Sequence, residues 1–288
     1  MLDALKINLL VEEIKKKKEL LYVSDSFVKE FVVKYLQQQQ KISQALQKDL
    51  NPKSKAYALV IKNVRAQLRR VYGLFRDDSG TRKKLVQDLL KSQKQKQISI
   101  INEILSTHTS TQERLPMYEG LYSRIFKITG QPKVILDLGC GINPFSFSYM
   151  KLQKCTYYAY DVNEEEIQSL NIYFRLLHQE NIHFQGRAEL LDIRSEAVLA
   201  KDLPVAEVCF LFKMTEVMDR GKGHTKTEAV LKKIPAKQIV VSFATKTMSG
   251  KKMTAPRRKW MEWLCKRLGY EYTLLEFPNE IFYVVKKK

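Results

Sequence analysis

The chain has 288 residues, enough for one large domain or two domains of ordinary size. Its content of 44% apolar and 10% aromatic residues excludes wholesale disorder. The formal net charge is +19, from 50 Lys and Arg against 31 Asp and Glu, and so large an excess favours a polyanionic partner. We expect that partner to be nucleic acid, ahead of an anionic membrane surface.

The apolar stretches are too short to cross a bilayer, which takes roughly 20 residues. One of the longest, residues 205–212, is interrupted by Glu207. The first eleven residues show neither a basic segment ahead of an apolar run nor a small-residue cleavage site. The sequence therefore predicts no membrane span, no signal peptide and a cytoplasmic location.

The cysteines are widely spaced, and the histidines form no ligand pattern with them, so we expect no metal site. In a reducing compartment such thiols act as small hydrophobic side chains. We expect four packing residues: Cys140, Cys155, Cys209 and Cys265.

Residues 1–105 show helical periodicity and no strong strand pattern. Phe27 and Phe31 recur at helical spacing after a possible N-cap at Ser24 or Asp25. Breakers at 51–52 and 77–80 predict one helix over about 55–75 and another over 82–91. We expect a helical domain over 1–105, followed by a second domain over 106–288.

The helical region carries 22 Lys and Arg against 11 Asp and Glu, a net charge of +11. Any single basic run is typical of a solvated helix face. Several runs on one small domain, beside tyrosines, favour a surface that follows nucleic-acid phosphates. We expect this surface to include Arg69, Arg70, Arg82 and Lys83.

From Val134 onward, short apolar runs alternate with helical segments, which is typical of a parallel sheet flanked by helices. A final pair of runs, 272–277 and 281–285, is close enough in sequence to form an antiparallel hairpin. We place the earlier strands at 134–138, 157–161, 182–185, 207–212 and 238–243. This α/β arrangement, a Rossmann-like sheet ending in a hairpin, is the layout of class I methyltransferases.

The first of these strands leads into a glycine turn, with Gly139, Cys140 and Gly141 following Asp137. Small residues there let the backbone approach a ligand beyond the strand ends. The later glycine of a dinucleotide fingerprint is missing, because Asn143 and the two residues after it fill its place. S-adenosylmethionine, which has no pyrophosphate, is therefore favoured over a dinucleotide. The alternative is a tight turn that binds nothing.

Acidic residues follow the next two strands. Asp161, with Val162 beside it, ends the second strand, where a carboxylate can accept both ribose hydroxyls of an adenosine. Asp161 could instead cap the helix that follows. Leu191 and Asp192, after the third strand, could present an acceptor to the adenine amino group, although Asp192 could equally face solvent.

A segment before the sheet, residues 108–114, reads HTSTQER. Ser110 and Glu113 have the spacing of a capping box, which indicates a helix start. Arg114 would then lie in the first turn, where the helix dipole disfavours a cation. A guanidinium that grips the methionine carboxylate of the cofactor would explain its presence.

Several segments together resemble the 16S ribosomal RNA guanine-N7 methyltransferases of the Arm/Rmt type, which confer aminoglycoside resistance. The resemblance covers about residues 95–285, and the first helical domain matches only loosely, around 69–75. The matching segments are 108–115, 135–144, 159–161, 210–214 and 241–251. The combination of HxSTxER, the Lys-Met pair and SFxxKxxSGK is specific to this group.

The resemblance implies that Arg114, the glycine loop, Asp161 and Asp192 hold S-adenosylmethionine. It also implies that a target pocket faces the RNA of the small ribosomal subunit. Separately, we expect no metal, no protein partner and a monomeric enzyme. Thr215-Glu216 replaces the family's Leu-Pro, and Ala244 replaces its Pro, both near the target. The pocket residues implied are Lys213, Met214, Lys246, Ser249 and Lys251.

Guanine N7 carries a lone pair and no proton to remove, so alignment and electrostatics suffice and no general base is required. A base in folded RNA must be splayed out to be reached. Phe145, Phe147 and Phe243 are aromatic but are expected in the core. Two alternatives stay open: a methyltransferase for another base, such as adenine N1 of the same region or a tRNA, and a non-catalytic RNA-binding scaffold.

Overall fold

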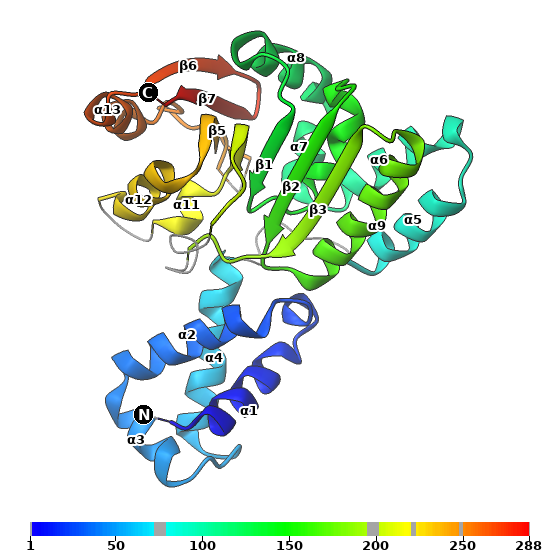
Figure 1. The fold of residues 1–288 in the computed structure, drawn as a ribbon. Helices are drawn as coiled ribbons and strands as arrows, with labels where there is room; N and C mark the ends of the chain where they lie inside the picture. The colour runs from blue at the N-terminus through cyan, green and yellow to red at the C-terminus, as the bar shows by residue number, and fades with distance from the viewer. Residues whose placement is uncertain (1, 72–78, 195–201, 220–222, 248–249, 288) are drawn as a thin grey trace. The chain divides into compact units, whose positions relative to one another are not determined.

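The computed structural model describes residues 2–71, 79–194, 202–219, 223–247 and 250–287 (Figure 1). The chain divides into two compact units. The first comprises residues 1–76 and the short segment 162–165, and the second comprises residues 77–161 and 166–288.

The first unit is helical. Its first helix begins after Asp3, whose carboxylate accepts a hydrogen bond of 2.8 Å from the backbone N–H of Lys6. Apolar side chains such as Leu10, Val32 and Val64 form its interior. The predicted helical character of this region is confirmed. Its elements are α1 Ala4–Lys15, η1 Lys18–Leu20, α2 Asp25–Gln38, α3 Gln40–Lys48 and α4 Lys55–Val71.

The second unit contains a seven-stranded sheet with the order β3-β2-β1-β4-β5-β7-β6. Five strands are parallel, β7 is antiparallel to β5, and β6 and β7 form the predicted hairpin. The strands are β1 Val134–Leu138, β2 Cys155–Asp161, β3 Phe184–Leu190, β4 Ala206–Phe212, β5 Ala236–Ala244, β6 Glu271–Glu276 and β7 Glu280–Lys286. Because β1 lies between β2 and β4, the carboxyl ends of these strands meet at one edge.

The third strand begins later and extends further than predicted, running from Phe184 to Leu190 instead of over 182–185. The polar residues Arg187 and Glu189 interrupt the apolar run on which the prediction depended. At the edge of the sheet, with β2 as its neighbour, a strand can carry such exposed side chains.

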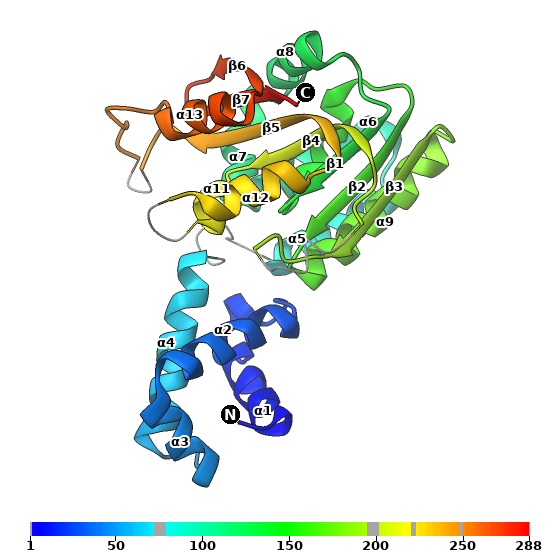
Figure 2. The same ribbon diagram turned by 60° about the vertical axis from the view of Figure 1, so that its left-hand side comes forward.

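Helices cover both faces of the sheet (Figure 2). One face packs against α5 Ser79–Lys91, α6 Lys94–Ser106, α8 Tyr118–Thr129, α9 Glu164–Glu180 and the 3-10 segment η3 Asn143–Met150. The other packs against α12 Thr225–Lys233 and α13 Lys259–Leu268. Shorter pieces are α7 Thr109–Arg114, η2 Leu115–Met117 and α11 Thr215–Met218.

The division between the units falls earlier than the boundary expected at residue 105. Val86 and Leu89 of α5 lie in the same hydrophobic cluster as Ile104 of α6 and Phe145 beside the sheet. These two helices therefore complete one layer of the second unit and do not extend the first.

The cysteines are free thiols and are all buried, as predicted for packing residues. Phe145, Phe147 and Phe243 are also buried, which confirms them as core residues. Along the described ranges, no helix combines the length and apolar character needed to cross a membrane.

Candidate functional site

The glycine turn after β1 adopts backbone angles that favour glycine. Gly139 has φ of +68° and Gly141 has φ of +50°. A Cβ built on Gly139 would lie 2.3 Å from Sδ of Met214, and one on Gly141 would lie 3.5 Å from Nε2 of His108. Side chains from two other segments therefore pack directly on the turn.

The turn is bound to the end of β2. The backbone N–H groups of Gly139 and Cys140 donate to the carbonyl of Tyr160, at 2.8 and 3.0 Å. The Asp161 carboxylate accepts from the N–H of Gly141 at 2.9 Å and is 8% exposed. The structure thus brings the glycine loop and Asp161 together at the carboxyl edge of the sheet.

The residues after β3 are partly committed to other contacts. Leu191 donates its N–H to the carbonyl of Asp161 at 2.9 Å, which places it next to the loop. The Asp192 carboxylate accepts hydrogen bonds from the Arg194 guanidinium at 3.0 and 2.7 Å. Val162 belongs to the first unit, where its carbonyl accepts from the N–H of Ser24 at 2.9 Å.

Asp137 and Asn143 support the glycine loop from inside the protein. Asp137 is 1% exposed and accepts from the Tyr157 hydroxyl at 2.8 Å and the Asn143 amide at 3.0 Å. The Tyr118 hydroxyl donates to the side-chain Oδ1 of Asn143 at 3.1 Å. Burial raises the pKa of Asp137 to about 6, against the two hydrogen bonds that lower it. Both buried side chains therefore support the conformation of the glycine loop from the interior of the protein.

The predicted capping box before Arg114 is wrong. Helix α7 is only six residues long and has His108 as its N-cap, and Ser110 bonds Nδ1 of that histidine at 3.0 Å. Arg114 consequently lies in the last turn, where a cation is favourable against the helix dipole. The dipole therefore gives no reason to expect a ligand at Arg114.

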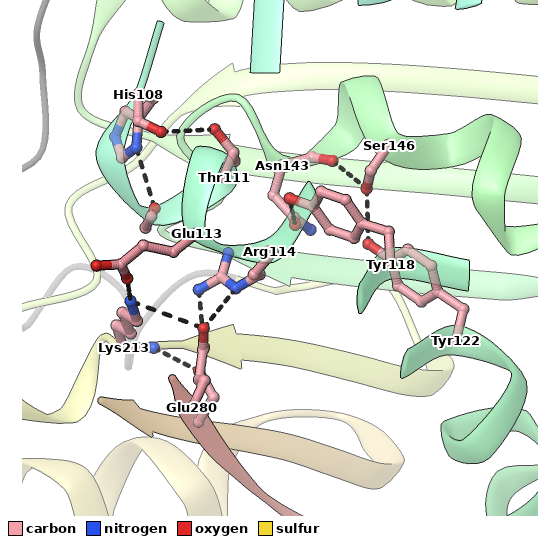
Figure 3. A network of polar contacts seen from close by, with 12 residues as sticks. His108, Thr111, Glu113, Arg114, Tyr118, Tyr122, Asn143, Ser146, Lys213 and Glu280 are labelled. Carbon is pink, nitrogen blue, oxygen red and sulfur yellow. Dashed lines mark hydrogen bonds and ion pairs between the residues drawn. The ribbon is translucent and has the colours of Figure 1, made fainter. Parts of the chain in front are cut away.

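Arg114 is the centre of a buried charge network (Figure 3). Its Nε and Nη2 donate to the two carboxylate oxygens of Glu280, each at 2.9 Å. The exposed fractions of these two side chains are 2% and 0%. Lys213 lies 2.6 Å from Glu113 and 3.7 Å from Glu280, and Ser242 donates its hydroxyl to Glu280. Strands β4, β5 and β7 thus place their ends around α7.

Charge balance keeps Glu280 ionised. Burial alone would raise its pKa, but the positive charges of Arg114 and Lys213, with hydrogen bonds from Arg114 and Ser242, lower the pKa below its ordinary value. The pair keeps the pKa of Arg114 above its ordinary range despite burial. Glu280 was missed in the sequence because it lies 166 residues from its partner and fits no local pattern.

The residues implied for the target pocket occupy different environments. Lys213 is 10% exposed and committed to the charge network, while Met214 packs on the glycine loop. Lys246 is partly buried and Lys251 is exposed, in a loop closed by a 2.8 Å bond from the N–H of Thr247 to the carbonyl of Lys251. Ser249 lies outside the described residues.

Three of the four predicted nucleic-acid contacts are exposed. Arg69 and Arg70 lie on α4 of the first unit, and Arg69 makes a loose ion pair with Glu19 at 3.4 Å. Lys83 is exposed on α5 of the second unit.

The prediction that Arg82 contacts nucleic acid is wrong. Its side chain is 1% exposed and its Nη1 lies 3.0 Å from Oε1 of Glu166, which is fully buried. Its Nε and Nη2 donate to the hydroxyl and the carbonyl of Thr107, at 2.9 and 3.3 Å. Arg82 therefore links α5, the end of α6 and α9 within the second unit, and its guanidinium cannot reach a phosphate.

The strand order, the C-terminal hairpin, the glycine loop and the carboxylate that ends β2 define a class I methyltransferase fold. The sequence also matches the family described as Ribosomal RNA methyltransferase (FmrO) over residues 39–284. This chain belongs to that family. Among the described residues, no group of three or more His, Cys, Asp or Glu could hold a metal ion.

Two curated relatives carry the name 16S rRNA (guanine(1405)-N(7))-methyltransferase. The protein from Frankia casuarinae is 29% identical over 190 residues, and that from Proteus mirabilis is 26% identical over 190 residues. The matches cover 65% and 64% of this chain, and 64% of the length of each relative, slightly less than two thirds.

Solved structures share the fold. The 16S rRNA methyltransferase RmtF, in complex with S-adenosyl-L-homocysteine, aligns over 100% of both chains with a TM-score of 0.75 and 20% identity. The 16S rRNA methylase ArmA aligns over 70% of this chain and 98% of its own, with a TM-score of 0.53 and 26% identity.

Proposed function

We propose that this chain is an S-adenosylmethionine-dependent methyltransferase that modifies guanine N7 in the decoding A site of 16S rRNA. The observation that carries the proposal is the glycine loop, bound through Gly141 to Asp161 at the carboxyl edge of the sheet. Membership of a ribosomal RNA methyltransferase family supports the substrate class. The names of the two curated relatives support the base and the atom.

The glycine loop, Asp161 and Leu191 form the part of the site that fits an adenosine-containing cofactor. The glycine backbone offers close approach, and Asp161 lies beside it with a carboxylate suited to ribose hydroxyls. Leu191 follows along the same edge. Arg114 would hold the cofactor's carboxylate in addition to Glu280, which its Nε and Nη2 already contact. The bound cofactor supplies a methyl group on a positively charged sulfur.

The protein's own contribution is alignment and electrostatic environment. Guanine N7 would form its bond to the methyl carbon through its lone pair as the bond from that carbon to the cofactor's sulfur breaks, leaving the sulfur with the electron pair. N7 carries no proton, so no side chain needs to act as a base. The charge network of Arg114, Glu280, Lys213 and Glu113 positions the ends of α7 and β4 around the site. Such paired charges keep a fixed geometry while the RNA base is admitted.

The proposed macromolecular substrate is the assembled small ribosomal subunit. Residues 1–76 carry 16 Lys and Arg against 7 Asp and Glu, a net charge of +9 that suits a phosphate-rich surface. The exposed Arg69 and Arg70 are proposed contacts. We propose a monomeric enzyme that acts in the cytoplasm, where ribosomes are found, and that raises resistance to aminoglycosides when expressed in a susceptible host.

Calorimetry with S-adenosylhomocysteine tests the cofactor assignment. The variant Asp161→Ala removes an acceptor of charge-assisted hydrogen bonds, each worth about 1.5–3 kcal/mol, so affinity should fall roughly tenfold to several hundredfold. Asp88→Ala, which changes an exposed carboxylate on α5, is the matched control and should bind like the unaltered protein. Equal affinity in the two variants would remove Asp161 from the site.

A further inference from the structure

Helix α13 is amphipathic, with one large apolar side chain on its outer face. Its inner face buries Met261, Leu264 and Cys265 against the sheet. Its outer face carries Trp263, which is 73% exposed. A large aromatic side chain on the polar face of a helix contributes little to folding, and exposed aromatics of this kind often mark contact sites.

Positive charge surrounds this tryptophan. Lys259, Lys266 and Arg267 lie four residues before it and three and four residues after it, and so share its side of the helix. The nearby Glu262 is paired with Arg257 at 2.9 Å, and Arg267 is paired with a glutamate of α12. Among the residues that the structure describes, neither Lys259 nor Lys266 forms an ion pair. Residues 246–267 carry eight Lys and Arg against one Glu.

The start of α13 is anchored at the edge of the sheet that holds the candidate site. Arg258 donates to the carbonyl of Ala244, the last residue of β5, at 3.2 Å. Trp260 packs edge-on against Phe243, with ring centroids 5.7 Å apart, and stacks on His224 at 3.7 Å. Figure 2 shows α13 alongside β5. Trp263 follows Trp260 by three residues, so its Cα lies less than one helical turn, roughly 5 Å along the axis, beyond that of Trp260.

We infer that the outer face of α13 is a second RNA-binding surface, distinct from the target pocket. The Trp263 indole stacks on an unpaired base of the RNA that leads away from the site, while Lys259 and Lys266 neutralise flanking phosphates. The charge excess selects a polyanion. An aromatic face selects single-stranded RNA, because the bases of a duplex are already stacked. This inference rests on the proposed function only for the identity of the RNA.

Binding of short RNA probes tests the surface without the methylation reaction. The probes are a fluorescein-labelled single-stranded oligouridylate and a hairpin duplex of equal length, each titrated with the full chain. Loss of one stacked base by Trp263→Ala should weaken binding to the single strand by about fivefold to 150-fold. Trp263→Phe keeps an aromatic face and should retain most of the affinity, and the duplex should respond little.

Two exposed lysines at the amino ends of β1 and β2 serve as a matched control for Lys259 and Lys266. Lys259→Gln with Lys266→Gln should reduce the salt dependence of oligouridylate binding by roughly 0.7 per lost phosphate contact. Lys133→Gln with Lys154→Gln removes two exposed lysines that precede β1 and β2, and should leave the slope unchanged. A chain in which Trp260 is replaced by Phe retains one tryptophan, whose fluorescence should be quenched by the single-stranded probe.

Two results would overturn the inference. One is equal single-strand affinity for Trp263→Ala and the unaltered chain. The other is a change only in sedimentation, with the unaltered chain self-associating and Trp263→Ala monomeric, which would assign this face to a second copy. Failure of the proposed function gives a different pattern: no methylation of small subunits by the unaltered chain, with the effect of Trp263 on RNA binding intact.

Discussion

Glu280 is expected to be the residue on which the site's charge balance depends most. It is fully buried and accepts hydrogen bonds from Arg114, which is 2% exposed, and from Ser242. Glu280→Gln preserves the side-chain volume and removes the negative charge. Arg114 and Lys213 would then face one another with Glu113 as the remaining carboxylate nearby. Breaking a buried pair in this way costs about 3–5 kcal/mol, chiefly because a buried charge is left without compensation.

The assay is thermal and urea unfolding at neutral pH. For a unit of this size, each kcal/mol lowers Tm by about 2–4 °C, so Glu280→Gln should unfold roughly 6–20 °C earlier. Glu119→Gln breaks the exposed pair with Lys151 and should leave Tm unchanged, because solvent already screens those charges. Adding Arg114→Met to Glu280→Gln removes both buried charges and should recover part of the loss.

Two outcomes would refute this reasoning. If Glu280→Gln and Glu119→Gln had the same Tm, the buried network would contribute nothing to stability. If Arg114→Met and Glu280→Gln were additive, the two groups would act independently, contrary to the bidentate contact.

Three further expectations concern the glycine loop and helix α4. The pKa of Asp137 is raised in the folded state to about 6, so the stabilisation from its protonated form is complete below its unfolded pKa and is lost as pH rises through 6. The free energy of unfolding of Asp137→Asn should therefore rise by up to about 3 kcal/mol relative to that of the unaltered chain between pH 4 and 7, and parallel stability curves would contradict this. Gly139→Ala forces a side chain into the left-handed region, at a cost of about 1–2 kcal/mol, and the new Cβ must also displace Met214, so the loss should be at least this large. Gly120→Ala, in an open helical position, should stabilise the protein; chemical denaturation distinguishes the two variants, and equal effects would count against the loop geometry. Replacing Arg69 and Arg70 with Gln should flatten the salt dependence of small-subunit binding by roughly 0.7–0.9 per lost contact without altering S-adenosylhomocysteine affinity, and an unchanged slope would exclude the two arginines from docking.

The sheet was largely predictable because its central strands are buried on both faces and read as continuous apolar runs. β1 was found with its bounds, and β4 and β5 within two residues. β3 was placed poorly, since an edge strand has a polar sequence. Local composition therefore predicts strands well only where the sheet is covered.

The site was predictable only where its chemistry is local in sequence. The glycine loop and Asp161 follow directly from strand ends, and the structure brings them together. The partners of Arg114 and Arg82, by contrast, lie 166 and 84 residues away. Lys213 was expected to face RNA from the family resemblance, and Arg82 from its place in a basic run. Neither signal reveals the carboxylate that each side chain contacts in the folded protein. Tertiary packing determines which charged side chains are buried, and this cannot be predicted from local sequence composition.

The most direct test of the proposed function is the position of the methyl group. Purified small ribosomal subunits are incubated with the full chain and S-adenosylmethionine carrying a labelled methyl group, and the modified nucleotide is mapped by mass spectrometry of nuclease digests. We expect one methyl group per subunit, on N7 of a guanine in the decoding A site of 16S rRNA, and little label on protein-free rRNA. A methyl group on adenine N1 or on a tRNA, or no transfer by a chain that still binds S-adenosylhomocysteine, would contradict the proposed function.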